Sequence, residues 1–177
     1  MIPRLLICTA TSLVLVAVAG AADRGPSKSS NDAGVVFRKP FTLRVRVDQE
    51  HYYEEKKDKV PYVYHGDVYL FIGDRFGLKI DVAGGAVRAV RYERDLSKAD
   101  LTLEFSEGDL VKGRYSSILK MQNRTKYTFL MDGAMTVPDR KEILETSINP
   151  VNAGLLHYEA WPHPIVQLAL SHIRLQK

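Results

Sequence analysis

Cysteine is nearly absent from this chain, since Cys8 is the only one among 177 residues. A disulfide-stapled fold and a cysteine zinc ribbon both need several cysteines, so the sequence excludes these two classes. An excess of one charge is lacking as well, because 25 Lys and Arg residues are balanced by 21 Asp and Glu residues. The resulting formal net charge of +4 is too small and too evenly scattered for a nucleic-acid-binding stripe. We therefore expect no nucleic acid among its partners.

Long apolar runs are absent except near the start. Arg4 precedes a mostly apolar stretch of fourteen residues, Leu5–Val18, and small residues with an Ala-x-Ala pattern follow at Ala19–Ala22. This order of segments is that of a secretory signal peptide, so we predict that residues 1–22 are cleaved. The alternative is a membrane anchor, which needs about 20 apolar residues. Because the stretch is shorter than that, we expect the mature chain not to span a membrane.

Cleavage after Ala22 would leave 155 of the 177 residues, and none of them is cysteine. An exported domain without disulfides needs a hydrophobic core, and a chain of about 150 residues is long enough, since it buries roughly 70% of its unfolded surface. Small secreted animal domains are often rich in cysteine, so we expect the bacterial periplasm, with an extracellular location as the alternative. Residues 23–34 (DRGPSKSSNDAG) predict a flexible leader, followed by a single domain over 35–177.

Alternation of apolar and polar residues is the clearest signal in the mature chain. In Phe41–Val47 (FTLRVRV) every second residue is apolar, which is the period of a strand with one buried face. Arg75–Val82 and Leu101–Phe105 alternate in the same way. Ser106–Asp109 consists largely of turn-forming residues, and we expect it to end the strand before it.

Glycines between these segments predict tight turns. Gly73-Asp74 has the chemistry of a type II′ hairpin, with glycine first, and would join Asp67–Ile72 to Arg75–Val82. Gly84-Gly85 would then lead into Val87–Tyr92. Together these turns predict a three-stranded meander.

The second half of the chain predicts one more hairpin and an ambiguous tail. Asn123–Lys126 is a polar connection that would join Ile118–Gln122 to Tyr127–Met131. Asp139–Leu144 follows a proline and could form one turn of helix. Ile165–Leu175 (IVQLALSHIRL) fits a helix or a strand, and we favour a central strand because no helix-capping residue begins it and no glycine ends it.

About eight or nine short strands with little helix predict an all-β fold. We favour an antiparallel β-sandwich over the alternative, a closed β-barrel, because a long polar insert over Asp48–Lys59 breaks the even spacing of an up-and-down barrel. The alternating segment Leu119–Thr136, which passes through Asn-Arg-Thr, resembles the strands of immunoglobulin-like sandwich domains. This resemblance concerns the fold alone and implies no functional residues.

Histidine is the only obvious source of metal ligands or catalytic bases. In an extended backbone His157 and Glu159 share one face, and His163 follows shortly after them. Two imidazoles and a carboxylate could bind zinc or copper, although the spacing matches no standard zinc finger or HExxH motif. The alternative is a proline-kinked loop in which Trp161 packs on the core and the histidines lie at its edge. We favour the loop and expect no cofactor.

Tyrosine is concentrated in one region, with five residues between Tyr52 and Tyr69. The adjoining segment His51–Lys59 carries charges of both signs. Tyrosines supply rigid apolar area and charges steer an encounter, so we predict a contact surface here. The alternatives are a solvated insert whose charges cancel, or tyrosines that line the core face of a sheet. The candidate binding residues are Tyr52, Tyr53, Tyr62, Tyr64 and Trp161.

Catalytic motifs are lacking too. The chain contains neither a G-x-S-x-G elbow nor a G-x-G-x-x-G loop, and its mature part has no cysteine nucleophile. We therefore predict an exported, non-enzymatic binding module that recognises a protein or another envelope component, as an inhibitor, an immunity-type partner or an assembly subunit. The alternatives are a small-molecule or lipid carrier with a β-barrel cavity, and a metal-dependent enzyme that uses His157, Glu159 and His163.

Overall fold

The computed structural model describes residues 34–138 and 140–177, so the predicted signal peptide, residues 23–33 and Asp139 lie outside the described residues. Within the described ranges the regular elements are twelve strands and no helix. No helix of membrane-spanning length and apolarity therefore occurs in this part of the chain. The described strands form two five-stranded antiparallel sheets and one two-stranded sheet, none closed into a barrel. The predicted β-sandwich is confirmed, and the β-barrel alternative is wrong.

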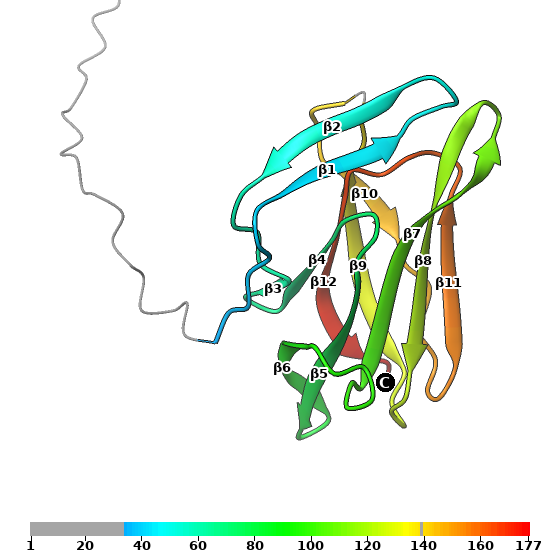
Figure 1. The fold of residues 1–177 in the computed structure, drawn as a ribbon. Coiled ribbons are helices and arrows are strands. Elements are labelled where there is room, and N and C mark those ends of the chain that lie inside the picture. Colours follow the sequence, from blue (N-terminus) through cyan, green and yellow to red (C-terminus); the bar gives the residue numbers. More distant parts are fainter. Residues whose placement is uncertain (1–33, 139) are drawn as a thin grey trace, which may run out of the picture. The chain divides into compact units, whose positions relative to one another are not determined.

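The first sheet has the strand order β10-β9-β12-β4-β3. It forms one layer of the ribbon in Figure 1. Its strands, in chain order, are β3 (Val63–Tyr64), β4 (Asp67–Leu70), β9 (Phe129–Thr136), β10 (Leu144–Ser147) and β12 (Gln167–Leu175).

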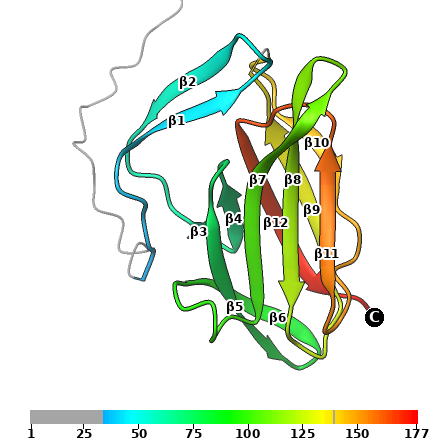
Figure 2. The same ribbon diagram turned by 45° about the vertical axis from the view of Figure 1, so that its right-hand side comes forward.

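The second sheet has the strand order β11-β8-β7-β5-β6, and the remaining two strands pair only with each other. Figure 2 shows the β1–β2 pair beside the two larger sheets. The second sheet contains β5 (Arg75–Ala83), β6 (Ala86–Glu93), β7 (Leu101–Val111), β8 (Arg114–Asn123) and β11 (Leu156–Trp161), and the pair contains β1 (Phe41–Arg46) and β2 (Tyr52–Lys57).

The core lies between the two larger sheets and follows directly from the alternation. On β7, Leu101, Leu103 and Phe105 are fully buried, and their neighbours Leu119 and Met121 on β8 are buried with them. Each such side chain stabilises the fold by about 1.5–3 kcal/mol relative to an exposed position. The first sheet supplies the opposite side of the core, including Val68, Leu70, Phe129, Met131, Leu168 and Leu170.

The Gly73-Asp74 turn joins the two sheets instead of closing a hairpin. β4 lies in the first sheet and β5 in the second, so the predicted meander is wrong, although its β5–β6 hairpin across Gly84-Gly85 is confirmed. Gly73, with φ at +94°, donates its N–H to the Phe105 carbonyl of β7 over 2.8 Å. Alternation identifies a strand but not its partner. β4 and β5 each bury one face in the same core. They do so from opposite sides, because the chain crosses from one sheet to the other at this turn.

The Asn123–Lys126 turn crosses between the sheets in the same way, because β8 belongs to the second sheet and β9 to the first. The predicted hairpin is therefore wrong. The fully buried Asn123 amide donates to the carbonyls of Tyr127 (2.7 Å) and Val151 (3.0 Å). Its carbonyl oxygen accepts the N–H of Thr125 over 2.9 Å. These bonds satisfy the buried amide and hold the crossover in place.

β7 continues to Val111, past the turn-forming residues Ser106–Asp109, so the predicted end of this strand is wrong. A β-bulge between Glu107 and Leu110 accommodates these residues, and pairing with β8 resumes beyond it as far as Val111 and Arg114. A bulge adds a residue to one strand without ending the ladder. The result is a long β7–β8 hairpin.

Two other segments differ from the sequence-based expectation and one agrees with it. The predicted polar insert over Asp48–Lys59 contains β2. Its strand character is hidden because its half-buried face carries Glu55 and Lys57 as well as tyrosine. The described residues 140–144 form no helical turn, since Leu144 already pairs with β9. The predicted central strand in Ile165–Leu175 is confirmed, because β12 lies between β9 and β4.

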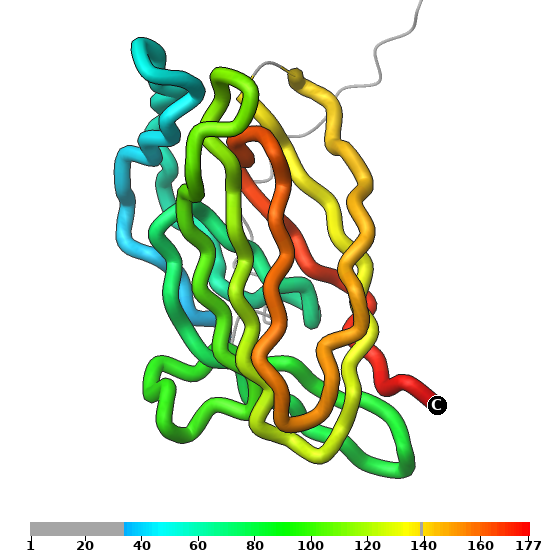
Figure 3. Tube along the Cα trace, turned by 90° about the vertical axis from the view of Figure 1, so that its right-hand side faces the viewer, coloured from blue at the N-terminus to red at the C-terminus, as the bar shows by residue number. Residues whose placement is uncertain are grey.

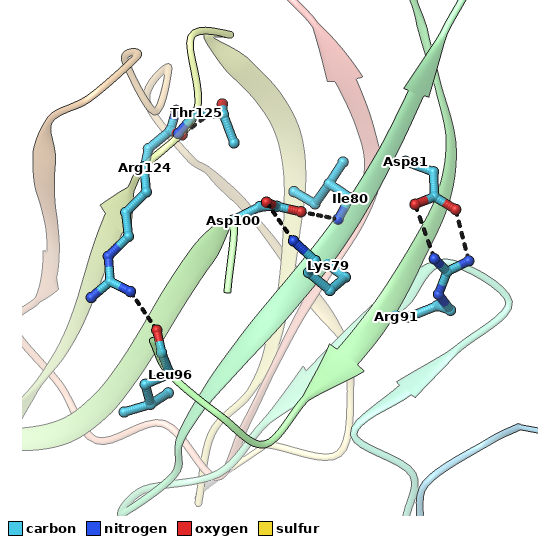
Figure 4. Close-up of polar contacts among 9 residues, drawn as sticks. Lys79, Ile80, Asp81, Arg91, Leu96, Asp100, Arg124 and Thr125 are labelled. Atoms are coloured by element: carbon cyan, nitrogen blue, oxygen red, sulfur yellow. Dashed lines mark hydrogen bonds and ion pairs between the residues drawn. The ribbon is translucent and has the colours of Figure 1, made fainter. Parts of the chain in front are cut away.

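The loop between β6 and β7 is fixed by charged side chains (Figure 4). Asp100 accepts the N–H of Ile80 (2.8 Å) and the ammonium group of Lys79 (2.9 Å), at the point where β5 separates from β7. Arg124 donates to the carbonyl of Leu96 in the same loop. Ion pairs and hydrogen bonds therefore hold the β6–β7 loop in place at this end of the molecule.

Candidate functional site

The candidate site lies on the outer face of the β1–β2 sheet. The inner face buries Leu43 and Val45 against Phe71 and Val166, which form a small core of their own. Because side chains alternate along a strand, Arg44 and its neighbours two residues away point outward. The burial of the two apolar residues thus fixes which side chains are presented to solvent.

Tyr52 lies on this outer face and is 47% exposed. The Arg44 guanidinium lies over its ring, with 3.9 Å between the guanidinium carbon and the ring centroid. Arg44 also forms an ion pair with Glu54 on β2, with 3.0 Å between nitrogen and oxygen. A cation over an aromatic ring is attractive by about 0.5–1 kcal/mol at an exposed site, and it restricts both side chains.

The β7–β8 hairpin extends the same surface. Arg46 donates its backbone N–H and its Nε–H to the Glu107 carboxylate over 2.9 and 2.7 Å, and the hydrogen bond raises the pKa of Arg46. The guanidinium of Arg46 lies 4.1 Å from the ring centroid of Tyr115. Leu110, cross-strand partner of Tyr115, is 39% exposed. We call Arg44, Arg46, Tyr52 and Tyr115 the Tyr–Arg strip.

The composition of the Tyr–Arg strip suits binding better than catalysis. Tyrosine and arginine are enriched at protein interfaces and among the residues that dominate binding energy. The rings are held by guanidinium groups, so little side-chain entropy is left to lose when a partner binds. The four residues of the strip include no serine, cysteine, histidine or carboxylate, which are the usual nucleophiles and general bases.

Four of the five predicted binding residues lie away from the strip. Tyr53 points to the inner face of the β1–β2 sheet, and Tyr64 contacts His65 with ring centroids 4.1 Å apart. Tyr62 stacks on Tyr92 over 4.3 Å and packs against the main core. The structure therefore does not bring the predicted tyrosines together into one surface.

Trp161 is part of the sandwich edge. It is buried, it contacts Phe105 edge to face, and its indole N–H donates to the Thr146 hydroxyl over 2.8 Å. This bond links β11 to β10, which lie side by side at this edge (Figure 3). Trp161 thus helps to join the two sheets and is not available to a partner.

His157 and Glu159 share a face of β11, as the extended backbone predicts, and their side chains meet over 2.8 Å. Glu159 also accepts the backbone N–H of Asn149 over 2.7 Å. His163 does not join them, since its imidazole contacts the neighbouring Pro164 carbonyl. Across residues 34–138 and 140–177, no three His, Cys, Asp or Glu side chains are placed to hold a metal ion. β11 is an edge strand of the second sheet. Inward-pointing polar side chains, here His157 and Glu159, protect such a strand from pairing with other chains.

A second histidine cluster lies on the outer face of the first sheet, beside an open groove of about 590 Å³. His172 occupies a β-bulge with φ at +50°, and its Nδ1 lies 3.0 Å from Asp132 and 3.5 Å from the Ser171 hydroxyl. Hydrogen bonds from Arg174 and His172 lower the pKa of Asp132. Because serine and aspartate approach the same ring nitrogen, the cluster lacks the geometry of a Ser-His-Asp triad.

Sequence reasoning missed part of the Tyr–Arg strip. Arg44 and Arg46 are visible as the polar face of an alternating strand, but nothing in the sequence places Arg46 beside Tyr115 of β8. Tyr115 follows Lys112-Gly113, which forms the tip of the β7–β8 hairpin. Gly113, placed between Leu110-Val111 and Tyr115, was the available signal for that hairpin.

The comparisons with known proteins give no further guidance. The chain matches no protein-family model, no curated protein and no solved structure. A functional interpretation therefore depends on the geometry of the chain itself.

Proposed function

We propose that this protein is an exported, non-enzymatic binding module that recognises a protein or another component of the cell envelope through the Tyr–Arg strip. Export rests on the signal-peptide pattern of residues 1–22, and the bacterial periplasm is the proposed compartment. The observation that carries the binding proposal is the exposed Tyr52 ring, restrained by Arg44 on the outer face of a small sheet.

Two further features support this choice. The strip continues onto the β7–β8 hairpin, where Tyr115 and the exposed Leu110 add apolar area beside the arginines. Interfaces combine such an apolar and aromatic centre with a charged rim. Glu54 and Glu107 lie at the edge of the strip, so a partner would meet both charge signs around it.

The experiment is quantitative crosslinked capture from the native envelope, followed by affinity measurement with the captured partner. Tyr52→Ala and Arg44→Ala should each weaken binding about tenfold or more, as expected for central interface residues. Tyr53 is unsuitable for this test, because its ring packs on the inner core and its removal would disturb the sheet.

Tyr158→Ala is the matched control. Tyr158 is 56% exposed, but it lies on β11 in the second sheet. Its removal should leave binding unchanged. Urea unfolding should show that the three variants stay folded, with free energies of unfolding within about 1–2 kcal/mol of the wild type, because the lost contacts are exposed. Equal capture by the Tyr52 variant, the Tyr158 variant and the wild type would refute the assignment of the strip.

A further inference from the structure

A surface cleft of about 580 Å³ lies between residues 36–41, the turn after β4 and the end of β6. Pockets for small molecules have volumes of about 300–1,000 Å³ and are mostly apolar. We call it the Arg38 cleft, and its aromatic lining consists of Phe37, Phe41, Tyr62, Phe71 and Tyr92.

Arg38 holds these walls in place. Its side chain is only 5% exposed and forms an ion pair with Asp74 over 2.6 Å. The same guanidinium donates to the carbonyls of Pro61 (2.6 Å) and Tyr69 (2.7 Å) and lies 3.9 Å from the centroid of the Tyr62 ring. The cleft is therefore already formed without a ligand, which lowers the entropic cost of binding.

The aromatic walls are themselves packed together. Tyr62 stacks on Tyr92 with centroids 4.3 Å apart and contacts Phe76 edge to face over 5.1 Å. Tyrosine is already neutral at physiological pH, and burial raises the pKa of Tyr92 further. The walls thus offer a rigid, uncharged surface to an apolar group.

The rim of the cleft carries positive charge. Lys39 and Arg94 line it, both are exposed, and neither has a hydrogen bond or ion pair with any residue of the described ranges. The acidic lining residue, Asp74, is neutralised by Arg38. The cleft therefore has a net positive charge beside an aromatic surface.

We infer that the Arg38 cleft binds a small molecule with an apolar body and one anionic group, such as an aromatic carboxylate or sulfonate. The apolar body packs on the aromatic walls, and Lys39 and Arg94 pair with the anionic group. This site involves other residues than the Tyr–Arg strip, so it goes beyond the proposed function and does not depend on it.

The test uses the purified protein and two fluorescent probes with the same ring system. Anilinonaphthalene sulfonate carries the anionic group, and N-phenylnaphthylamine lacks it. The sulfonate should bind saturably, and the shifts that it causes in the protein's amide NMR signals should map to residues 36–39, Phe41 and Gly73. The double variant Lys39→Met/Arg94→Met should weaken the sulfonate about tenfold, because two partly exposed charge pairs are lost. The neutral probe should bind this variant as it binds the wild type.

Lys98→Met is the matched control. Lys98 lies in the same loop as Arg94, its side chain is 72% exposed, and it is absent from the cleft lining. It should change neither affinity. The inference is overturned by NMR shifts outside the cleft, by the absence of saturable sulfonate binding, or by a double variant that binds the sulfonate as the wild type does.

Discussion

Replacing Arg38 by methionine should destabilise the protein more than any comparable change to a surface arginine. Arg38 joins three separate segments, because it bonds to Pro61, Tyr69 and Asp74. Methionine keeps most of the side-chain volume but removes the charge and every side-chain hydrogen-bond donor. The Asp74 carboxylate, 16% exposed, would keep only its bond from the Phe71 N–H (2.8 Å).

The magnitude follows from the burial of the pair. Removing one partner of a buried ion pair costs about 3–5 kcal/mol, because the other charge is left without compensation. The two carbonyls would also lose their donor, at about 1–3 kcal/mol each where water does not replace it. Since water can enter the cleft beside Arg38, we expect a net loss of about 3–5 kcal/mol. A domain of this size has about 5–15 kcal/mol of stability in total.

Urea unfolding of three variants measures this effect. Arg38→Met should lower the urea midpoint strongly. Arg91→Met should lower the free energy of unfolding by at most about 1 kcal/mol, because the side chains of the Arg91–Asp81 pair are 60% and 48% exposed. The double variant Arg38→Met/Asp74→Asn should recover part of the loss, since it leaves no unpaired buried charge. Similar costs for Arg38→Met and Arg91→Met would refute the reasoning.

Two more outcomes are expected. The hydrogen bond to Glu55 raises the pKa of Tyr53 from 10.0 to about 12. The stabilisation that this hydrogen bond gives the folded protein is therefore complete below pH 10 and disappears as the pH rises toward 12. A tyrosine ¹³C NMR titration, assigned with Tyr53→Phe, would contradict this if all rings titrated near 10. Gly77→Ala should destabilise by about 1–3 kcal/mol, because its Cβ would lie 2.4 Å from that of Ala99. An unchanged urea midpoint would contradict that expectation.

Most strands could be predicted from the sequence, because alternation depends only on each strand having one buried face. Phe41–Arg46 and Leu101–Phe105 show this, since Leu43 and Val45 lie in the small core and the alternate residues of Leu101–Phe105 lie in the main core. The sheet partner could not be predicted, because Gly73-Asp74 serves a hairpin and a crossover equally well. What distinguishes the two is a distant contact, the bond from Gly73 N–H to the Phe105 carbonyl.

The candidate site was predictable only in part, for the same reason. Tyr52 is recognisable as a tyrosine in a charged segment, and Arg44 as the outward face of a strand. Their contact depends on the register of β1 against β2, and the contact between Arg46 and Tyr115 depends on the packing of two hairpins. The Arg38 cleft lies further beyond sequence reasoning, since its walls come from separate parts of the chain.

The placement of the Tyr–Arg strip on a separate two-stranded sheet has a physical consequence. An isolated two-stranded sheet is marginally stable, so β1 and β2 depend on the burial of Leu43 and Val45 and on the Arg46–Glu107 contact. These contacts are few compared with those of the main core, so the β1–β2 sheet should open locally at a lower free energy than the sandwich unfolds. A partner that bound the proposed strip could therefore adjust this sheet without disturbing the sandwich, whereas a ligand in the proposed Arg38 cleft would meet walls fixed by a buried ion pair.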